Sequence, residues 1–188
     1  MSVLFSDICS FTPLSGRMSP RQVIELLNDY FDVLCPIVKA EGGDIDKFIG
    51  DAIMAVFDEL PGREPPPLRA VRAGVAMQAA LRAFNEGRPT PLAMRVGVNT
   101  GPLVRGDLGS RHVRRDFTVI GDTVNRASRY ESSCPRGEVL ISASTLEPIA
   151  DLVTAAPLPG LKLKGVEEPV TGYVVKTVAP PRDPEGEP

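Results

Sequence analysis

The chain has 188 residues, of which 43% are hydrophobic and 24% are charged, and its formal net charge is −3. This length and composition predict one globular domain with a substantial core, and the weak negative charge argues against a nucleic-acid partner. No apolar stretch approaches the roughly 20 residues that a membrane helix needs, so we expect no membrane contact by this segment. The three cysteines, Cys9, Cys35 and Cys134, are widely spaced, which favours reduced thiols and a cytoplasmic location.

The residue pattern predicts alternating strands and helices along most of the chain. Ser19 begins a helix, because Pro20 follows at the first helical position and Gln22 completes a capping box. Gly50 and Asp51 predict the turn of a hairpin. In chain order we expect a strand at 2–8, a helix from 20 to 41, strands at 45–49 and 52–57, a helix at 68–84, a strand at 94–98 that continues over 104–107, a strand at 117–120, a helix at 123–132, a strand at 139–141, a short helix at 144–150, and strands around 161–164 and 172–176.

The opening order of strand, helix, hairpin, helix and strand is that of the split βαβ arrangement in ferredoxin-like folds. We therefore expect an α+β domain with a mostly antiparallel sheet and helices on one face, which leaves the other face free to carry a site. A C-terminal β/α extension follows this core. The domain is expected to span residues 1–177, and the proline-rich segment 178–188 is expected to be a disordered tail.

Two aspartates stand where apolar strands are expected to end. Asp7 lies near the end of the first strand, and Asp51 lies in the turn of the hairpin. Neighbouring strands would bring the two carboxylates together, and Mg²⁺ usually takes one or two carboxylates plus substrate phosphates. Either aspartate alone would equally suit a structural turn. As a pair embedded in these two segments, they favour a metal site.

Three segments, Phe5–Ile8, Phe48–Ala52 and Thr118–Arg129, together resemble the class III nucleotidyl cyclases, the family that makes cyclic AMP or cyclic GMP. The resemblance covers roughly residues 2–177. It implies that Asp7 and Asp51 bind two Mg²⁺ (or Mn²⁺) ions with the backbone carbonyl of Ile8. One ion would acidify the ribose 3′-hydroxyl and the other would hold the triphosphate.

The resemblance also assigns Lys47 and Thr118 to the purine base. A lysine donor suits the acceptor N1 of adenine, and the threonine hydroxyl can accept from the adenine 6-amino group, although it can also donate. The Lys/Thr pair matches a subgroup that includes soluble, bicarbonate-responsive adenylate cyclases, so bicarbonate is a candidate regulator. Without the resemblance, Lys47 would be read as an exposed strand lysine.

Four further positions are implied to bind the sugar and the phosphates. Asn125 would orient the ribose and Arg129, four residues later on the same helix face, would neutralise charge on the α-phosphate. Lys164 would hold the far end of the triphosphate from a strand face that it shares with Lys162; a lysine that protects an edge strand is the alternative. In the basic run 111–115, Arg114 has the better spacing to reach the phosphates, whereas such a run is usually a solvated loop.

The segment after Asp7 is expected to open a short helix that contains Phe11 and Thr12. Backbone N–H groups at a helix start attract phosphate oxygens, and in the family this turn cradles the β- and γ-phosphates. Many helices begin in this way, so the motif alone is weak.

Taken together, the sequence predicts an adenylate cyclase domain that converts ATP to cyclic AMP and pyrophosphate. The family works as a head-to-tail dimer with composite sites, and this chain carries both sets of residues, so a homodimer is expected. Two alternatives stay open: a guanylate or purine-promiscuous cyclase, and a nucleotide-binding regulatory module that has lost catalysis.

Overall fold

The computed structural model describes residues 1–181; of the predicted tail, 182–188 lie outside the described residues. The order of the elements agrees closely with the sequence prediction. The helices and strands are β1 (Ser2–Ile8), α1 (Phe11–Ser15), α2 (Pro20–Ala40), β2 (Asp44–Ile49), β3 (Ala52–Phe57), α3 (Pro66–Phe84), β4 (Met94–Thr100), β5 (Val104–Ser110), β6 (Arg114–Ile120), α4 (Asp122–Ser133), β7 (Val139–Ile141), α5 (Ala143–Leu146), the 3₁₀ helix η1 (Glu147–Ile149), β8 (Val153–Leu161) and β9 (Val170–Val178).

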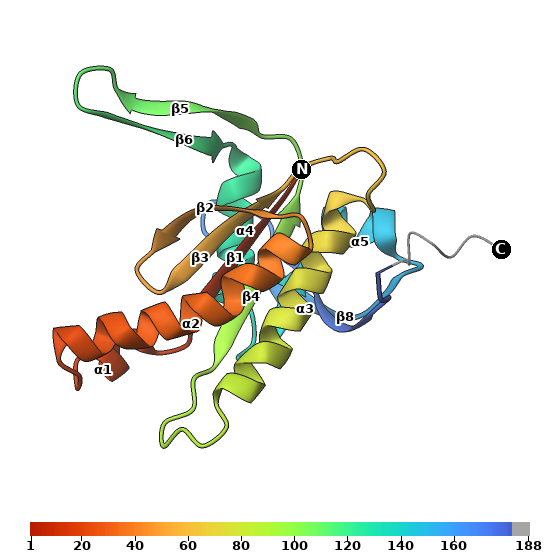
Figure 1. Cartoon of the computed structure of the whole chain (residues 1–188). Coiled ribbons are helices and arrows are strands. Elements are labelled where there is room, and N and C mark those ends of the chain that lie inside the picture. Colours follow the sequence, from red (N-terminus) through yellow and green to blue (C-terminus); the bar gives the residue numbers. More distant parts are fainter. Residues whose placement is uncertain (182–188) are drawn as a thin grey trace.

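A seven-stranded sheet with the order β2-β3-β1-β4-β7-β9-β8 forms the centre of the domain. Its pairs are antiparallel except for β4 and β7, which run parallel. The first four strands, with α2 and α3, form the expected ferredoxin-like core, and β7, β9 and β8 extend the sheet on the β4 side (Figure 1). The prediction of an α+β ferredoxin-like fold is confirmed.

The two long helices α2 and α3 cover one face of this sheet (Figure 1). α2 begins as predicted, because the Ser19 hydroxyl and the Gln22 side chain cap each other's backbone N–H groups. Pro36 lies within α2, which continues to Ala40. The main core lies between these helices and the sheet, and its fully buried members include Leu4, Tyr30, Leu34, Ile53, Phe57, Leu68, Met77 and Ile141.

Helix α4 packs against the opposite face, which the sequence prediction had left without a helix. At Gly97 of β4 the contact is so close that an added Cβ would lie 2.1 Å from the backbone nitrogen of Glu131 in α4. Val3 and Phe5 of β1 pack beside Ala127 of α4 in a second, smaller core. Only a residue without a side chain permits this approach of helix backbone to strand backbone. α4 is thereby held over the central strands β1 and β4.

The predicted continuation of β4 over 104–107 is wrong. Gly101 and Pro102 interrupt the strand, and β5 and β6 instead pair with each other as a separate two-stranded arm that projects from the main sheet (Figure 1). Val119 of β6 is buried, but the other large apolar side chains of this arm are exposed: Val104, Leu108, Val113, Phe117 and Ile120. An exposed apolar surface of this kind marks an interaction site.

The predicted strand at 161–164 is also wrong in its position. β8 ends at Leu161, and Lys164 lies in a turn whose next residue, Gly165, has a φ of +75°. Lys162 and Lys164 therefore do not share a strand face. β8 contains two prolines, which an edge strand tolerates because one side of its backbone needs no partner.

Candidate active site

Asp7 and Asp51 lie side by side at one end of the sheet. Gly50, with a φ of +65°, forms the tight turn between β2 and β3 that directs Asp51 towards the end of β1. One carboxylate oxygen of Asp51 accepts a hydrogen bond from the backbone N–H of Ile8 at 3.0 Å. Burial and the neighbouring Asp7 carboxylate raise the pKa of Asp51 to about 6. Two carboxylates this close disfavour each other's ionisation until a cation neutralises them.

An arginine that the sequence analysis missed holds Asp7 from the neighbouring strand. Arg95 of β4 stands directly opposite Asp7 in the β1–β4 pairing and donates to its carboxylate at 3.0 Å. The same guanidinium lies 3.1 Å from the carboxylate of Glu131 in α4. Burial raises the pKa of Glu131 to about 7, although Arg95 opposes that rise. Arg95 therefore orients Asp7, and its position follows from strand register rather than from any local motif.

The carboxylates at this end of the sheet suit a magnesium ion that takes most of its other ligands from the substrate. Residues 1–181 contain no cluster of three or more His, Cys, Asp or Glu side chains suited to metal binding. Asp7 and Asp51 instead supply two carboxylates, the number that Mg²⁺ usually takes when phosphates complete its shell. The raised pKa of Asp51 is the mark of an anionic pair that a divalent cation would relieve.

Lys47 and Thr118 form the second group, on β2 and β6. The ammonium of Lys47 donates to the Thr118 hydroxyl at 2.8 Å, although the two residues are 71 positions apart. Thr118 is buried, at 3% exposure. A third residue joins them: the Thr118 hydroxyl donates to the carboxylate of Asp46 at 2.7 Å. The sequence analysis missed Asp46, because strict strand alternation would place it on the face opposite to Lys47.

Asn125, Arg129 and Lys164 lie around the outer side of α4. Asn125 is exposed and Arg129 is half-buried one helical turn later. The turn that carries Lys164 contacts Arg129, since a Cβ at Gly165 would lie 3.4 Å from its guanidinium. Leu163, at 3% exposure, anchors this turn against Tyr130 of α4 and against Cys134, which directly follows the helix. The structure thus brings Lys164 to Arg129 from a turn rather than from the predicted strand.

Phe11, Thr12 and Arg114 are the remaining predicted substrate-binding residues. Phe11 begins α1 and packs against the main core, whereas Thr12 is exposed. Ser10, which caps α1, has a φ of +60°, an uncommon backbone conformation for a residue other than glycine. Arg114 lies on the arm, where it is exposed and pairs with Asp116 at 2.8 Å. Within the described part of a single chain it contacts neither Asp7 nor Asp51.

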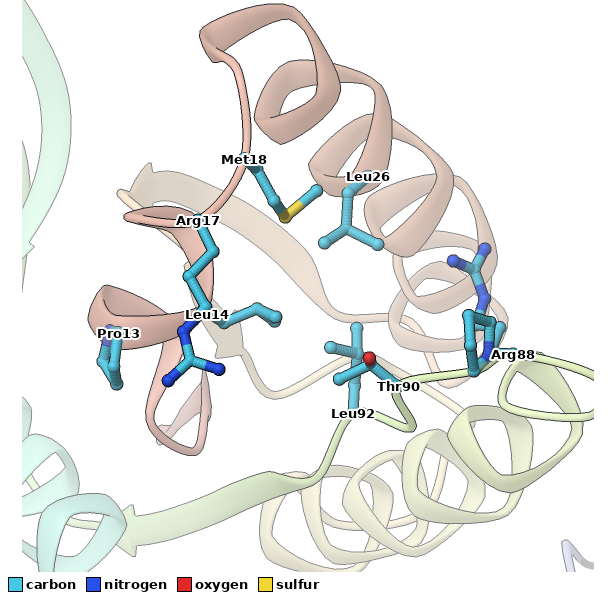
Figure 2. A pocket seen from close by; sticks show the side chains of 9 residues that line it. Pro13, Leu14, Arg17, Met18, Leu26, Arg88, Thr90 and Leu92 are labelled. Atoms are coloured by element: carbon cyan, nitrogen blue, oxygen red, sulfur yellow. The ribbon is translucent and has the colours of Figure 1, made fainter.

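A cavity of about 560 Å³ lies elsewhere, between α1, the start of α2 and the loop before β4 (Figure 2). Apolar side chains and two arginines line it, among them Leu14, Met18, Leu26, Arg17 and Arg88. None of the predicted site residues faces it.

Comparison with known proteins identifies the family of this chain. The model of the adenylate and guanylate cyclase catalytic domain matches residues 1–177. An adenylate cyclase of Anabaena cylindrica is 34% identical over 94% of this chain, which spans 36% of that relative's length. Atrial natriuretic peptide receptor 2 of Rattus norvegicus is 36% identical over 81% of this chain, or 15% of its own length.

Solved structures of nucleotidyl cyclases match this chain over the whole domain. The adenylyl cyclase CyaB of P. aeruginosa superposes with a TM-score of 0.88 at 35% identity, over 97% of this chain and 96% of that one. The guanylyl cyclase Cya2 superposes with a TM-score of 0.87 at 37% identity, over 95% and 92%. Adenylate and guanylate cyclases are thus about equally similar to this chain in sequence and in structure. By its sequence and its fold, the chain belongs to the class III adenylate and guanylate cyclase catalytic domains.

Proposed function

We propose that this domain is an adenylate cyclase that converts ATP to 3′,5′-cyclic AMP and pyrophosphate. The contact between Lys47 and Thr118 carries the choice of ATP, because it places a donor and a hydroxyl oxygen side by side at 2.8 Å. Adenine presents an acceptor at N1 and a donor at its 6-amino group, whereas guanine presents the reverse pair. Glutamate, which guanylate cyclases tend to carry at the position of Lys47, would suit guanine instead.

Metal positioning and charge neutralisation would provide the catalysis, without a covalent intermediate. Asp7, Asp51 and the Ile8 carbonyl would hold two Mg²⁺ (or Mn²⁺) ions, which when bound make the ribose 3′-hydroxyl a better nucleophile and neutralise the triphosphate. Arg129 would bind the α-phosphate in its transition-state geometry, because its planar fork grips phosphate oxygens and never loses its proton.

The remaining residues would orient the substrate. Asn125 would position the ribose, and Lys164 would hold the far end of the triphosphate. The backbone around Phe11 and Thr12 would contact the β- and γ-phosphates, and Arg114 would approach them from the arm.

Two copies of the chain would build each site, in a head-to-tail homodimer. Asn125 and Arg129 lie on the side of α4 that points away from the chain's own sheet. The exposed apolar side chains of the β5–β6 arm, Phe117 among them, offer the contact surface. Asp7→Ala and Arg129→Ala variants, each inactive alone, are expected to regain activity when mixed. Continued inactivity of a mixture whose mixed dimers have been verified would contradict shared sites.

A cyclic nucleotide assay with ATP and with GTP, each in Mg²⁺ and in Mn²⁺, tests the proposed activity. We expect cyclic AMP as the main product. The similarity to Cya2 favours cyclic GMP as the second candidate, and equal turnover of both triphosphates would show a promiscuous enzyme. Binding of an ATP analogue without release of pyrophosphate from ATP would identify a regulatory module instead.

We further propose bicarbonate as a regulator and the cytoplasm as the location. Bicarbonate rests on the Lys/Thr pair, and unchanged turnover on its addition at fixed pH would refute it. The cytoplasmic location rests on the cysteines: Cys9, Cys35 and Cys134 are free thiols. Within residues 1–181 no helix has the length and apolar character to span a bilayer.

A further inference from the structure

Asp46 occupies an irregular position in β2, directly beside Lys47. In the pairing of β2 with β3, Ile45 stands opposite Ala55 and Lys47 stands opposite Met54, so Asp46 is an extra residue without a partner. Such a β-bulge breaks the alternation of side chains and can turn two successive residues to the same side. Here it turns Asp46 and Lys47 together towards β6.

The Asp46 side chain is almost completely buried, at 6% exposure, and it forms a triangle of polar contacts with Thr118 and Lys47: two hydrogen bonds and one ion pair. One of its carboxylate oxygens accepts from the Thr118 hydroxyl at 2.7 Å and lies 3.2 Å from the Lys47 ammonium. Lys47 also donates to the Thr118 oxygen at 2.8 Å. A buried carboxylate is costly unless it is paired, so this arrangement is strongly held once formed.

The triangle fixes the direction of every hydrogen bond in it. A carboxylate accepts and does not donate, so the single hydroxyl proton of Thr118 must point to Asp46. The Thr118 oxygen accepts from Lys47 and keeps one lone pair free. Lys47 donates one N–H to Thr118 and forms an ion pair with Asp46, so it still has an N–H group to donate. The surface offered to a base is therefore one donor from Lys47 and one acceptor from Thr118.

We infer that Asp46 is a specificity-determining residue, which locks the Thr118 hydroxyl as an acceptor and so selects adenine over guanine. This inference rests on the proposed cyclase function and deepens it. With Asp46 in place, guanine would set its O6 acceptor against the free lone pair of Thr118 and its N1–H against the Lys47 ammonium. Without Asp46, the hydroxyl of Thr118 can rotate and donate to O6, which removes part of that rejection.

The test compares kcat/KM for ATP and GTP in the wild type, Asp46→Ala and Asp46→Asn. In Asp46→Ala the Thr118 hydroxyl is no longer held as an acceptor. We therefore expect the ratio of kcat/KM for ATP to kcat/KM for GTP to fall by about tenfold or more. Asp46→Asn, which keeps the volume and can hold the hydroxyl in either direction, is expected to fall between Asp46→Ala and the wild type. Asp44→Ala removes an exposed aspartate from the same strand, one that pairs with Lys39 at 2.8 Å, and is expected to keep the wild-type ratio.

An unchanged ratio in both Asp46 variants would overturn the inference and leave the cyclase function standing. A merely structural role of Asp46 would lower the turnover of both triphosphates equally, which would also overturn it. If the wild type makes no cyclic nucleotide, the proposed function fails. The same comparison is then made by calorimetric binding of ATP and GTP, where a loss of ATP preference in Asp46→Ala supports the inference and an unchanged preference overturns it.

Discussion

Substitution of Gly97 by alanine tests whether α4 is positioned by direct backbone contact with β4. The new Cβ would lie 2.1 Å from the Glu131 nitrogen, 2.6 Å from its Cα and 2.7 Å from the Ala127 carbonyl oxygen. Ordinary contact of such atoms begins near 3.5 Å, so α4 must move by roughly 1.5 Å. Overpacking usually costs about 1–3 kcal/mol, and we expect the upper end because backbone rather than a flexible side chain must move.

Thermal unfolding and turnover together measure the effect. A loss of about 3 kcal/mol would lower the Tm by roughly 6–12 °C for a domain of this size. Turnover is expected to fall about 100-fold in the folded variant, because α4 carries Asn125 and Arg129 and a displacement of about 1 Å can cost that much.

A matched control removes a glycine that has space around it. Gly106→Ala meets no atom within 4 Å and is expected to stay within about 0.5 kcal/mol of the wild type. If Gly97→Ala unfolds at the wild-type temperature and turns over normally, α4 is not held against β4 as described.

Three further predictions concern Asp51, the metal ions and the turn that carries Lys164. The pKa of Asp51 is raised to about 6, so the native state binds the Asp51 proton more tightly than the unfolded chain does. In metal-free urea unfolding, the stability that this proton contributes should be present below pH 4 and lost as the pH rises through 6. Asp51→Asn should flatten this dependence of the free energy of unfolding on pH. A profile that is identical in the variant would refute the raised pKa of Asp51. Millimolar Mg²⁺ should raise the Tm of the wild type, since it binds only the native pair, and should not raise that of Asp7→Asn. Leu163→Ala removes a buried contact with α4 and should lower the free energy of unfolding by about 2–4 kcal/mol. It should also raise the KM for ATP, because Leu163 holds the turn that carries Lys164. An unchanged KM would show that Lys164 does not bind ATP.

Local patterns in the sequence were enough to predict most of the secondary structure. The capping box at Ser19 and the turn at Gly50 each depend on neighbours within a few positions, and each predicted its element closely. The ferredoxin-like core followed from the order of the elements, because few sheet topologies are compatible with strand, helix, hairpin, helix and strand.

The errors arose where distant segments compete for the same residues. The stretch after Gly101 alternates well enough to continue β4, but it pairs with β6 in the arm instead. The stretch that contains Lys164 alternates like a strand, but burial of Leu163 against α4 turns it out of the sheet. In both cases a tertiary contact decided between local conformations of similar energy.

The sequence by itself determined the fold and the identity of the chemical groups, because hydrophobic period, turn residues and short motifs are local properties. Tertiary structure alone decided which groups act on one another. Arg95 reaches Asp7 through strand register, Asp46 turns to Thr118 through a bulge, and α4 rests on Gly97 through a contact between distant backbones. Hydrogen-bond direction and charge coupling depend on distances of a few ångströms, and only the packed chain sets those distances.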